Sequence, residues 1–426
     1  MTPTHSPRLL DRAQCLEADQ GDPLRELAAR FALPSGVIYL DGNSLGALPR
    51  HVPERVERAV REQWGTGLIR SWNDAGWIDA PRRAGASIAR LIGARADEVI
   101  VADSTSINLY KLLSAALALR PDRRVILTES GNFPTDLYIA QGLLEQIDRG
   151  HRLVRAGRDR ILEALDDQVA VLMLTQVDYR TGERSDLAEI TAAAHRVGAL
   201  VIWDLAHSAG AFQVDLGLAQ ADFAVGCGYK YLNGGPGAPA FAFVARDHHD
   251  GLRQPLTGWL GHAAPFAFEP DYQPASGVGR LLCGTPPVLS LTALEAALEV
   301  FDDAEAFGGL AALEAKAACL TDLFIERFEA CCGESGLRLI TPRDASKRGN
   351  QISLAADDPA QGYALMQALI DAGVIGDFRA PDILRFGFAP LYLSRVDVWD
   401  AVETLARLIE TGAWDDPRWQ RRKAVT

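Results

Sequence analysis

Short apolar runs alternate with helical patterns through the middle of the chain. The apolar runs, each short enough to be a buried strand, are residues 98–102, 124–128, 152–155, 169–175, 200–203, 223–226 and 240–244. The helical patterns between them are residues 107–119, 135–147, 159–165 and 187–197. Strands that alternate with helices in this way predict an α/β domain built on a mainly parallel sheet.

The pattern changes near residue 290, where an Ala-rich, Leu-rich stretch begins. Residues 290–332 predict two helices broken near Gly308-Gly309. The segments that follow predict strands and helices of an α+β domain, at residues 337–340, 351–354, 363–371, 383–388 and 396–408. Near the start, the pattern predicts a strand at 37–40 and a helix at 51–64. We therefore expect an N-terminal segment 1–45 that packs on the small domain, a large domain 46–288 and a small C-terminal domain 289–426.

Length and composition agree with a globular protein of two domains. The chain has 426 residues, of which 48% are hydrophobic and 23% charged, which excludes a disordered or collagen-like chain. No apolar stretch approaches the ~18 residues of a membrane span, and residues 1–7 lack the apolar region of a secretory signal. The net charge of −13 argues against binding to nucleic acids or anionic membranes.

Six cysteines are spread along the chain without a CxxC pair. Adjacent Cys331-Cys332 is not a metal-ligand spacing, so we expect no metal site. In a chain of this length without a signal segment, the pattern predicts free thiols and a cytoplasmic location.

The strongest chemical signal is a carboxylate and a lysine that each follow a predicted strand. Asp204 directly follows the apolar run 200–203, and Lys230 lies in a glycine-rich segment after the run 223–226. In open α/β sheets, ligands bind at the carboxyl ends of the strands. Alone, Lys230 would be read as a surface lysine. Together with Asp204, it matches the needs of pyridoxal phosphate, which bonds a lysine amine and pairs its ring nitrogen with a carboxylate.

Two further segments supply what such a cofactor needs. Thr105 and Ser106 open the predicted helix 107–119, so their hydroxyls and the free amides there form an anion site for a phosphate. Phe133 could stack on the pyridine ring, and Asp136 could orient it. Each segment also has a simpler reading, as a helix N-cap and as a turn with proline at the first helical position.

With these motifs, nearly the whole chain resembles the kynureninase family of aspartate-aminotransferase-like pyridoxal phosphate enzymes. The resemblance rests on five sequence motifs, at 39–46 (YLDGNSLG), 132–136 (NFPTD), 203–207 (WDLAH), 228–237 (GYKYLNGGPG) and 258–262 (GWLGH). The resemblance implies fold type I, with a large mainly parallel-sheet domain and a smaller α+β domain. It also implies a homodimer that hydrolyses L-kynurenine to anthranilate and L-alanine, with weaker action on 3-hydroxykynurenine.

The resemblance also implies roles for individual residues. Lys230 would hold the cofactor, and Asp204 would face its ring nitrogen. Tyr229 is in addition the candidate acid for protonating Cβ, because a phenol near a phosphate can relay a proton. The expected cofactor site comprises Thr105, Ser106, Phe133, Pro134, Thr135, Asp136, Thr175, Asp204, His207, Tyr229, Lys230 and, from the partner subunit of the homodimer, Trp259 and Thr285.

The substrate site follows from the same resemblance. Arg385 would pair with the α-carboxylate of the substrate, because an arginine fork fits a carboxylate with two hydrogen bonds. Asn43, Ser44 and Trp72 complete the expected set. Thr285 and Trp72 stand where animal members that favour 3-hydroxykynurenine carry Asn and His, which favours unsubstituted kynurenine as substrate. Trp72 could equally be a core or interface aromatic residue.

Two other functions remain open at this stage. A cysteine desulfurase of the same fold would need a nucleophilic cysteine on a mobile loop, and Cys283 is the one candidate. A catalytically silent scaffold is disfavoured because Asp204, His207, Lys230 and Arg385 are all present. Whether the reaction serves degradation or biosynthesis also stays open.

Overall fold

The structure is a computed structural model, and it describes residues 10–423. Residues 1–7, where no signal segment was expected, lie outside the described residues. The chain divides into two compact units. One comprises residues 51–179 and 184–299; the other comprises residues 180–183 and 300–423 together with the described residues up to 50. The division falls inside one helix, whereas the predicted boundaries at residues 45 and 288 stay a prediction.

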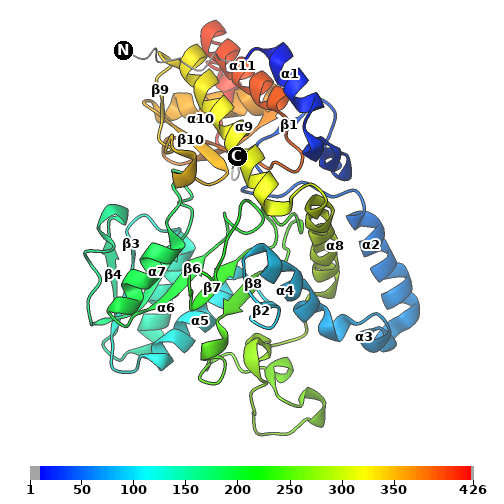
Figure 1. Cartoon of the computed structure of the whole chain (residues 1–426), viewed down its shortest axis with the longest axis vertical. Helices are drawn as coiled ribbons and strands as arrows, with labels where there is room; N and C mark the ends of the chain where they lie inside the picture. The colour runs from blue at the N-terminus through cyan, green and yellow to red at the C-terminus, as the bar shows by residue number, and fades with distance from the viewer. Residues whose placement is uncertain (1–9, 424–426) are drawn as a thin grey trace. The chain divides into compact units, whose positions relative to one another are not determined.

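The first unit, residues 51–179 and 184–299, is built on a seven-stranded sheet (Figure 1). In spatial order its strands are β2 (Val99–Val101), β8 (Phe241–Val244), β7 (Phe223–Gly226), β6 (Leu200–Asp204), β5 (Val169–Thr175), β3 (Val125–Glu129) and β4 (Arg152–Ala156). The five strands from β7 to β4 are parallel, and β8 runs antiparallel to both of its neighbours. The mainly parallel sheet predicted from the apolar runs is confirmed.

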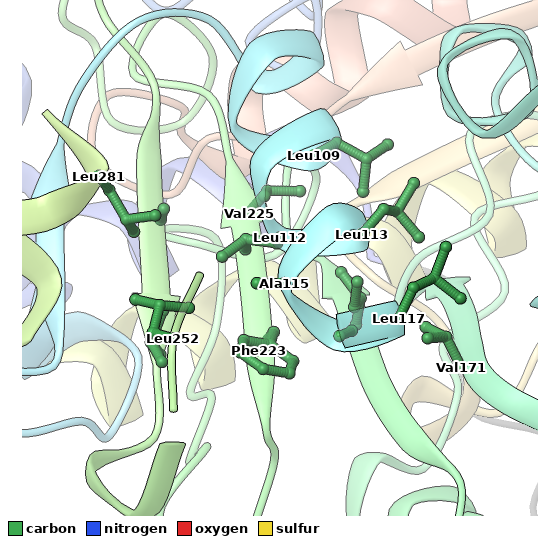
Figure 2. Close-up of a cluster of buried hydrophobic side chains, with 14 of the residues drawn as sticks. Leu109, Leu112, Leu113, Ala115, Leu117, Val171, Phe223, Val225, Leu252 and Leu281 are labelled. Atoms are coloured by element: carbon green, nitrogen blue, oxygen red, sulfur yellow. The ribbon is translucent and has the colours of Figure 1, made fainter. Parts of the chain in front are cut away.

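Four helices of this unit pack on the sheet because their apolar faces need burial: α4 (Ala80–Leu91), α5 (Thr105–Leu119), α6 (Pro134–Ile147) and α7 (Leu187–Arg196). The unit also contains α2 (Val52–Arg58), α3 (Ser71–Asp74) and most of α8 (Val288–Glu305), and α2 packs on α8. Figure 2 shows leucines of α5 against Val171 of β5 and Phe223 of β7. Leu109, Leu112 and Leu113 are fully buried, so α5 is firmly fixed on the sheet, and its N-terminus has a defined position.

Two expected helices of this unit differ from the structure. Residues 159–165 form only a 3-10 turn and loose turns, because the side chain of Asp166 accepts the amide of Gln168 and turns the chain into β5. The helix expected at 51–64 is regular only to Arg58 and continues as a wider π-helix, Ala59–Gly67. Gly65 and Gly67 lie in that stretch, and glycine weakens a regular α-helix.

The other unit contains the N-terminal and C-terminal parts of the described chain. Its elements are α1 (Arg12–Gln20), β1 (Ile38–Tyr39), the end of α8, α9 (Gly309–Cys332), β9 (Leu337–Leu339), β10 (Gln351–Ala356), α10 (Pro359–Asp371), β11 (Val374–Ile375), β12 (Asp377–Arg379), β13 (Ile383–Gly387) and α11 (Arg395–Thr411). An antiparallel sheet has the order β12-β13-β10-β9, and β1 pairs with β11 in parallel. The break between the two long helices at Gly308-Gly309 is confirmed.

Long-range pairing in this unit brings the N-terminal segment to β13. Residue 41 pairs with residue 387 in an isolated parallel bridge, directly after β1. On α1, Asp19 accepts the amides of Arg395 and Val396 at the start of α11. Such a carboxylate stabilises a helix N-terminus. Among the described residues, no helix has the length and apolar character that a membrane crossing requires.

A buried aspartate ties three elements of the sheet unit together. The carboxylate of Asp222, before β7, accepts hydrogen bonds from His195 Nε2 at 2.8 Å, His248 Nε2 at 2.7 Å and the amide of Val201 at 2.8 Å. Burial alone would raise the pKa of Asp222, but these hydrogen bonds outweigh it and lower the pKa. The hydrogen bond that His195 donates to Asp222 raises the pKa of His195.

Asp222→Asn should therefore lower the free energy of unfolding by about 2–3 kcal/mol, because an amide cannot accept all three bonds. Asp247→Asn is the control, since Asp247 is exposed. Because the pKa of Asp222 is lowered, the loss should shrink only in acid, below the ordinary pKa of an aspartate, as wild-type Asp222 becomes protonated. It should shrink again at high pH as His195, whose pKa is raised, loses its proton. Urea unfolding across that range measures both. A difference that grows continuously toward low pH would contradict this account.

Candidate active site

The carboxyl ends of the parallel strands open into one pocket. The side chains and backbone that line it are those of Thr105, Ser106, Phe133, Thr135, Asp136, Thr175, Tyr179, Asp204, Ala206, His207, Cys227, Tyr229 and Lys230. Most were expected from the sequence as cofactor residues, and the structure brings them together within the sheet unit. Strand pairing explains this, because Thr175 and Asp204 are partners at the ends of β5 and β6, and ligands gather at such an edge.

Asp204 is held rigidly at the floor of this pocket. Its side chain is 5% exposed, and its Oδ1 accepts the amide of Ala206 at 2.7 Å. Burial raises the pKa of Asp204, and the positive charge of Lys230 opposes that rise. The carboxylate therefore lies where a second cationic group would stabilise its ionised form.

A second carboxylate, Asp136, faces the same space from the first turn of α6. It is 1% exposed, and its Oδ2 has no hydrogen-bond partner in the part of the chain that the structure describes. Burial and the charge of Asp204 raise its pKa well above the usual value, and Lys230 opposes this. Next to it, the side chain of Asn132 accepts the Thr175 hydroxyl at 2.5 Å and the Phe133 amide at 2.7 Å, which fixes the turn before α6.

Lys230 approaches from the glycine-rich loop after β7. Its Nζ lies 6.0 Å from the ring centre of Phe133 and 5.9 Å from that of Tyr229. The loop is closely packed: a Cβ on Gly228 would lie 2.5 Å from the carbonyl oxygen of Pro239. Only glycine allows that approach, so this residue fixes the backbone two positions before Lys230.

The N-terminus of α5 supplies hydroxyls and unpaired amides. Ser104 is the N-cap, and its side chain accepts the amide of Ile107. Thr105 and Ser106 follow in the first turn and line the pocket. Below them, fully buried Lys111 donates to Asp103 at 2.5 Å and to the carbonyl of Leu281 at 2.5 Å. These bonds hold Asp103 at a left-handed φ of 48° and so set where the helix begins.

The residues present fit pyridoxal phosphate. Two buried carboxylates face one lysine, and one carboxylate oxygen has no partner among the described residues. A protonated ring nitrogen would supply the missing positive charge. The hydroxyls of Thr105 and Ser106, at a helix N-terminus, suit a phosphate. Phe133 is 37% exposed and forms a T-shaped contact with Tyr179 at 5.2 Å between ring centres, so part of its ring surface is open to a flat ring.

The expected substrate residues Ser44 and Arg385 form a separate cluster in the other unit. Arg385 is 1% exposed. It donates two hydrogen bonds to the carboxylate of Asp377, from Nε at 2.9 Å and from Nη2 at 2.5 Å. Its Nη2 also donates to the Ser44 hydroxyl at 2.9 Å. Arg379 reaches the same hydroxyl at 3.1 Å and the Asp377 carboxylate at 2.6 Å. Two guanidinium groups therefore share one carboxylate, which leaves positive charge for an anion.

Asn43 lies beside this cluster, and the burial of its side-chain amide is unusual. Its side chain is fully buried, yet neither the amide nitrogen nor the amide oxygen has a partner in the described structure. It lies against Gly387, where a Cβ would come within 2.0 Å of its oxygen. A buried amide left without partners points to a ligand, because an unpaired buried polar group is costly.

The remaining expected residues lie outside the pocket of this single chain. Trp72 is half-buried and packs edge-on against Trp77 at 6.1 Å. Trp259 is 38% exposed, Thr285 is exposed, and Pro134 begins α6. Their predicted roles, like those of the pocket residues, stay predictions.

Sequence reasoning missed several residues at both places. In the pocket these are Tyr179 and Cys227; burial raises the pKa of the Cys227 thiol, so it is held neutral. In the other cluster they are Asp377 and Arg379, on a strand too short to leave a pattern. Among the described residues, no group of three or more His, Cys, Asp or Glu side chains is placed to hold a metal ion.

Comparisons with known proteins agree on one family. Residues 313–405 match the model of the kynureninase C-terminal domain. A kynureninase of Burkholderia mallei is 52% identical over 421 residues, which cover 97% of this chain and 99% of that protein. A kynureninase of Pseudomonas fluorescens is 51% identical over the same shares of both chains.

Solved structures show the same fold at low sequence identity. A cysteine desulfurase of Escherichia coli has a TM-score of 0.75 at 21% identity, covering 91% of this chain and 98% of that one. A cysteine desulfurase of Thermococcus onnurineus has a TM-score of 0.73 at 19% identity, with the same coverage. The fold predicted from the resemblance, fold type I, is confirmed.

Proposed function

This chain belongs to the kynureninase family, and we propose that it hydrolyses L-kynurenine to anthranilate and L-alanine with pyridoxal phosphate as cofactor. The family membership carries the reaction. The observation that carries the cofactor is the pocket in which Lys230 faces the buried carboxylates of Asp136 and Asp204. When bound, pyridoxal phosphate supplies an electron sink for the carbon next to the substrate's amino group.

The pocket residues divide the work of holding the cofactor and moving protons. Lys230 would hold the cofactor through its amine, and the same amine would take the proton from Cα of the substrate. Asp204 would favour a proton on the cofactor's ring nitrogen. Thr105 and Ser106 hold the phosphate, and Tyr229 donates a proton to Cβ when the bond between Cβ and Cγ breaks.

The substrate is recognised by the arginine cluster of the other unit. This cluster comprises Ser44, Asp377, Arg379 and Arg385. Arg385 binds the α-carboxylate, with Ser44 and the unpartnered amide of Asn43 beside it. The second guanidinium, of Arg379, provides the charge that Asp377 does not neutralise. Trp72 and Thr285 face the aromatic part of the substrate, and their identities favour unsubstituted kynurenine.

The direct test is to incubate purified, cofactor-loaded protein with L-kynurenine and 3-hydroxykynurenine in parallel. The two fluorescent anthranilates report turnover, and the higher kcat/KM should belong to kynurenine. If the purified protein has no yellow colour, or has one that borohydride does not bleach, a silent scaffold would be indicated. Release of alanine from cysteine instead of kynurenine would indicate a desulfurase. The latter is not favoured, because the only candidate thiol, on Cys283, is held by the carbonyl of Leu256 at 2.9 Å.

We also propose a homodimer with active sites built from both chains. A run of apolar side chains after β8 supports it: Trp259, Phe266 and Phe268 are 38%, 61% and 79% exposed. Trp259 packs edge-on against Phe266 at 5.7 Å. Exposed aromatic groups that pack on one another are typical of a surface that another chain covers. The free thiols of all six cysteines support the cytoplasm as the location.

Mixing two inactive variants should restore activity if Trp259 reaches the partner's site. A dimer of one Lys230→Ala chain and one Trp259→Ala chain holds one site with both residues intact. Random pairing in equal amounts should therefore recover about a quarter of the wild-type rate. Mixing Lys230→Ala with Asp204→Asn is the control, because both residues belong to the same chain's pocket. Verified mixed dimers without activity would refute the shared site.

A further inference from the structure

The arginine cluster contains a second carboxyl group, on Asp41, that the proposed substrate binding does not use. Asp41 follows β1 and bridges to β13 through the backbone pair with Gly387. The side chain is mostly buried, and its Oδ1 has no hydrogen-bond partner in the described part of the chain. The charges of Asp377, Arg379 and Arg385 all act on it. It therefore belongs to the same electrostatic cluster.

The hydroxyl of Ser44 stands at the centre of that cluster. It donates to Asp377 at 2.8 Å and accepts from Arg385 at 2.9 Å and Arg379 at 3.1 Å. A hydroxyl has only one proton, so Ser44 cannot donate to Asp377 and to Asp41 at the same time. The two arginines and Asp377 leave one positive charge in excess. If Asp41 is ionised as well, the excess disappears.

We propose that Asp41 is a positioning residue whose protonated form keeps the arginine cluster cationic, so that Arg385 binds the substrate's α-carboxylate tightly. The inference rests on the proposed function, because it needs Arg385 as the carboxylate partner. The protonated carboxyl group can also donate its O–H toward an incoming carboxylate, since its Oδ1 has no hydrogen-bond partner among residues 10–423. Ionised Asp41 would instead repel that carboxylate.

The groups that face Asp41 place its titration near neutral pH. Burial raises its pKa most, the negative charge of Asp377 on β12 raises it further, and Ser44, Arg385 and Arg379 oppose the rise, giving a pKa of about 7. Tyr39, on β1, stays protonated, because burial and the charges of Asp41 and Asp377 raise its pKa. The cluster therefore changes by one charge as the pH passes through neutrality.

The protonation state of Asp41 sets the affinity of the arginine cluster for a carboxylate. Below pH 7, Asp41 is neutral and the affinity for the carboxylate is high; above pH 7, it is ionised and the affinity falls. One unit of charge gained or lost in a partly buried cluster changes the affinity for a carboxylate on the order of tenfold. By reciprocity, a bound carboxylate raises the pKa of Asp41 by about one unit.

The test is the pH profile of KM and kcat for L-kynurenine, measured with holoenzyme between pH 6 and 8.5. In the wild type, KM should rise about tenfold across this range. In Asp41→Asn, KM should stay near its low-pH value, while Asp41→Glu should restore the rise. The control Asp371→Asn removes an exposed carboxylate of the same unit and should follow the wild type. Identical KM profiles for wild type and Asp41→Asn would overturn the inference.

A measurement on the wild-type protein keeps the inference testable if the variants fold poorly. Infrared difference spectra between pH 6 and 8.5 should show a protonated carboxyl band that is lost at high pH. Adding L-alanine at pH 8 should restore part of that band. If L-alanine leaves the band unchanged, the proposed coupling between the protonation of Asp41 and carboxylate binding is wrong.

Arg385→Gln separates this inference from the proposed function. If Arg385 binds the α-carboxylate, this change raises KM for kynurenine strongly at every pH. An unchanged KM would remove the proposed role of Arg385, and the role of Asp41 with it. A raised KM in Arg385→Gln, together with a wild-type profile in Asp41→Asn, would leave the proposed function standing and reject Asp41 alone.

Discussion

Lys230→Ala should abolish turnover while the sheet unit stays folded. The loss should be on the order of 10⁴-fold or more, because the change removes both the amine that bonds the cofactor and the proposed base for Cα. The fold should persist because the loop is positioned by its glycine-restricted backbone and by buried neighbours rather than by the lysine. Steady-state rates of anthranilate release, with circular dichroism of the variant, measure both expectations.

The small number of lysines makes this assignment easy to check. The chain has five lysines, and Lys230 is the one that lines the described pocket. Lys111 and Lys316 are buried in ion pairs with Asp103 and Asp22, and exposed Lys347 offers the control variant Lys347→Ala. Borohydride reduction followed by peptide mapping should label Lys230. Label on another lysine, or near-normal activity of Lys230→Ala, would refute the role.

Much of the pocket could be predicted because its residues follow buried strands. The run 169–175 is apolar throughout and matches β5 residue for residue, since a strand buried on both faces needs no polar alternation. Once the strands are known, Asp204 and Lys230 must lie at one edge of the sheet. Asp136 was found because its segment, 132–136, follows a predicted strand and carries part of the family resemblance.

The arginine cluster could not be predicted in full because its parts meet only through long-range pairing. Asp377 and Arg379 lie on β12, which has three residues, too few for a period to show. Asp41 lies in a recognised motif, but the charged residues that act on it, Asp377, Arg379 and Arg385, are more than 300 positions away in sequence. Its environment depends on the pairing of β1 with β11 and on the bridge to Gly387.

Asp204→Asn should reduce kcat at least about 10²-fold, on the order of 3 kcal/mol in activation free energy. An amide keeps the hydrogen bond to Ala206, so the pocket should hold its shape. It cannot stabilise a proton on the cofactor's ring nitrogen, and the carbon next to the amino group then loses its electron sink. Bonding of Lys230 to the cofactor does not need that proton, so borohydride labelling should persist.

The neighbouring carboxylate gives this prediction its sharpest comparison. Asp136 is equally buried, and its Oδ2 lacks a partner among the described residues, so either aspartate could face the ring nitrogen on burial alone. Asp204 is favoured because the Ala206 amide fixes one of its oxygens and so holds the carboxylate in one orientation. Asp204→Asn should therefore lose more activity than Asp136→Asn. The reverse order would exchange their roles, and an Asp204→Asn enzyme within about threefold of wild type would show that its charge is not used in catalysis.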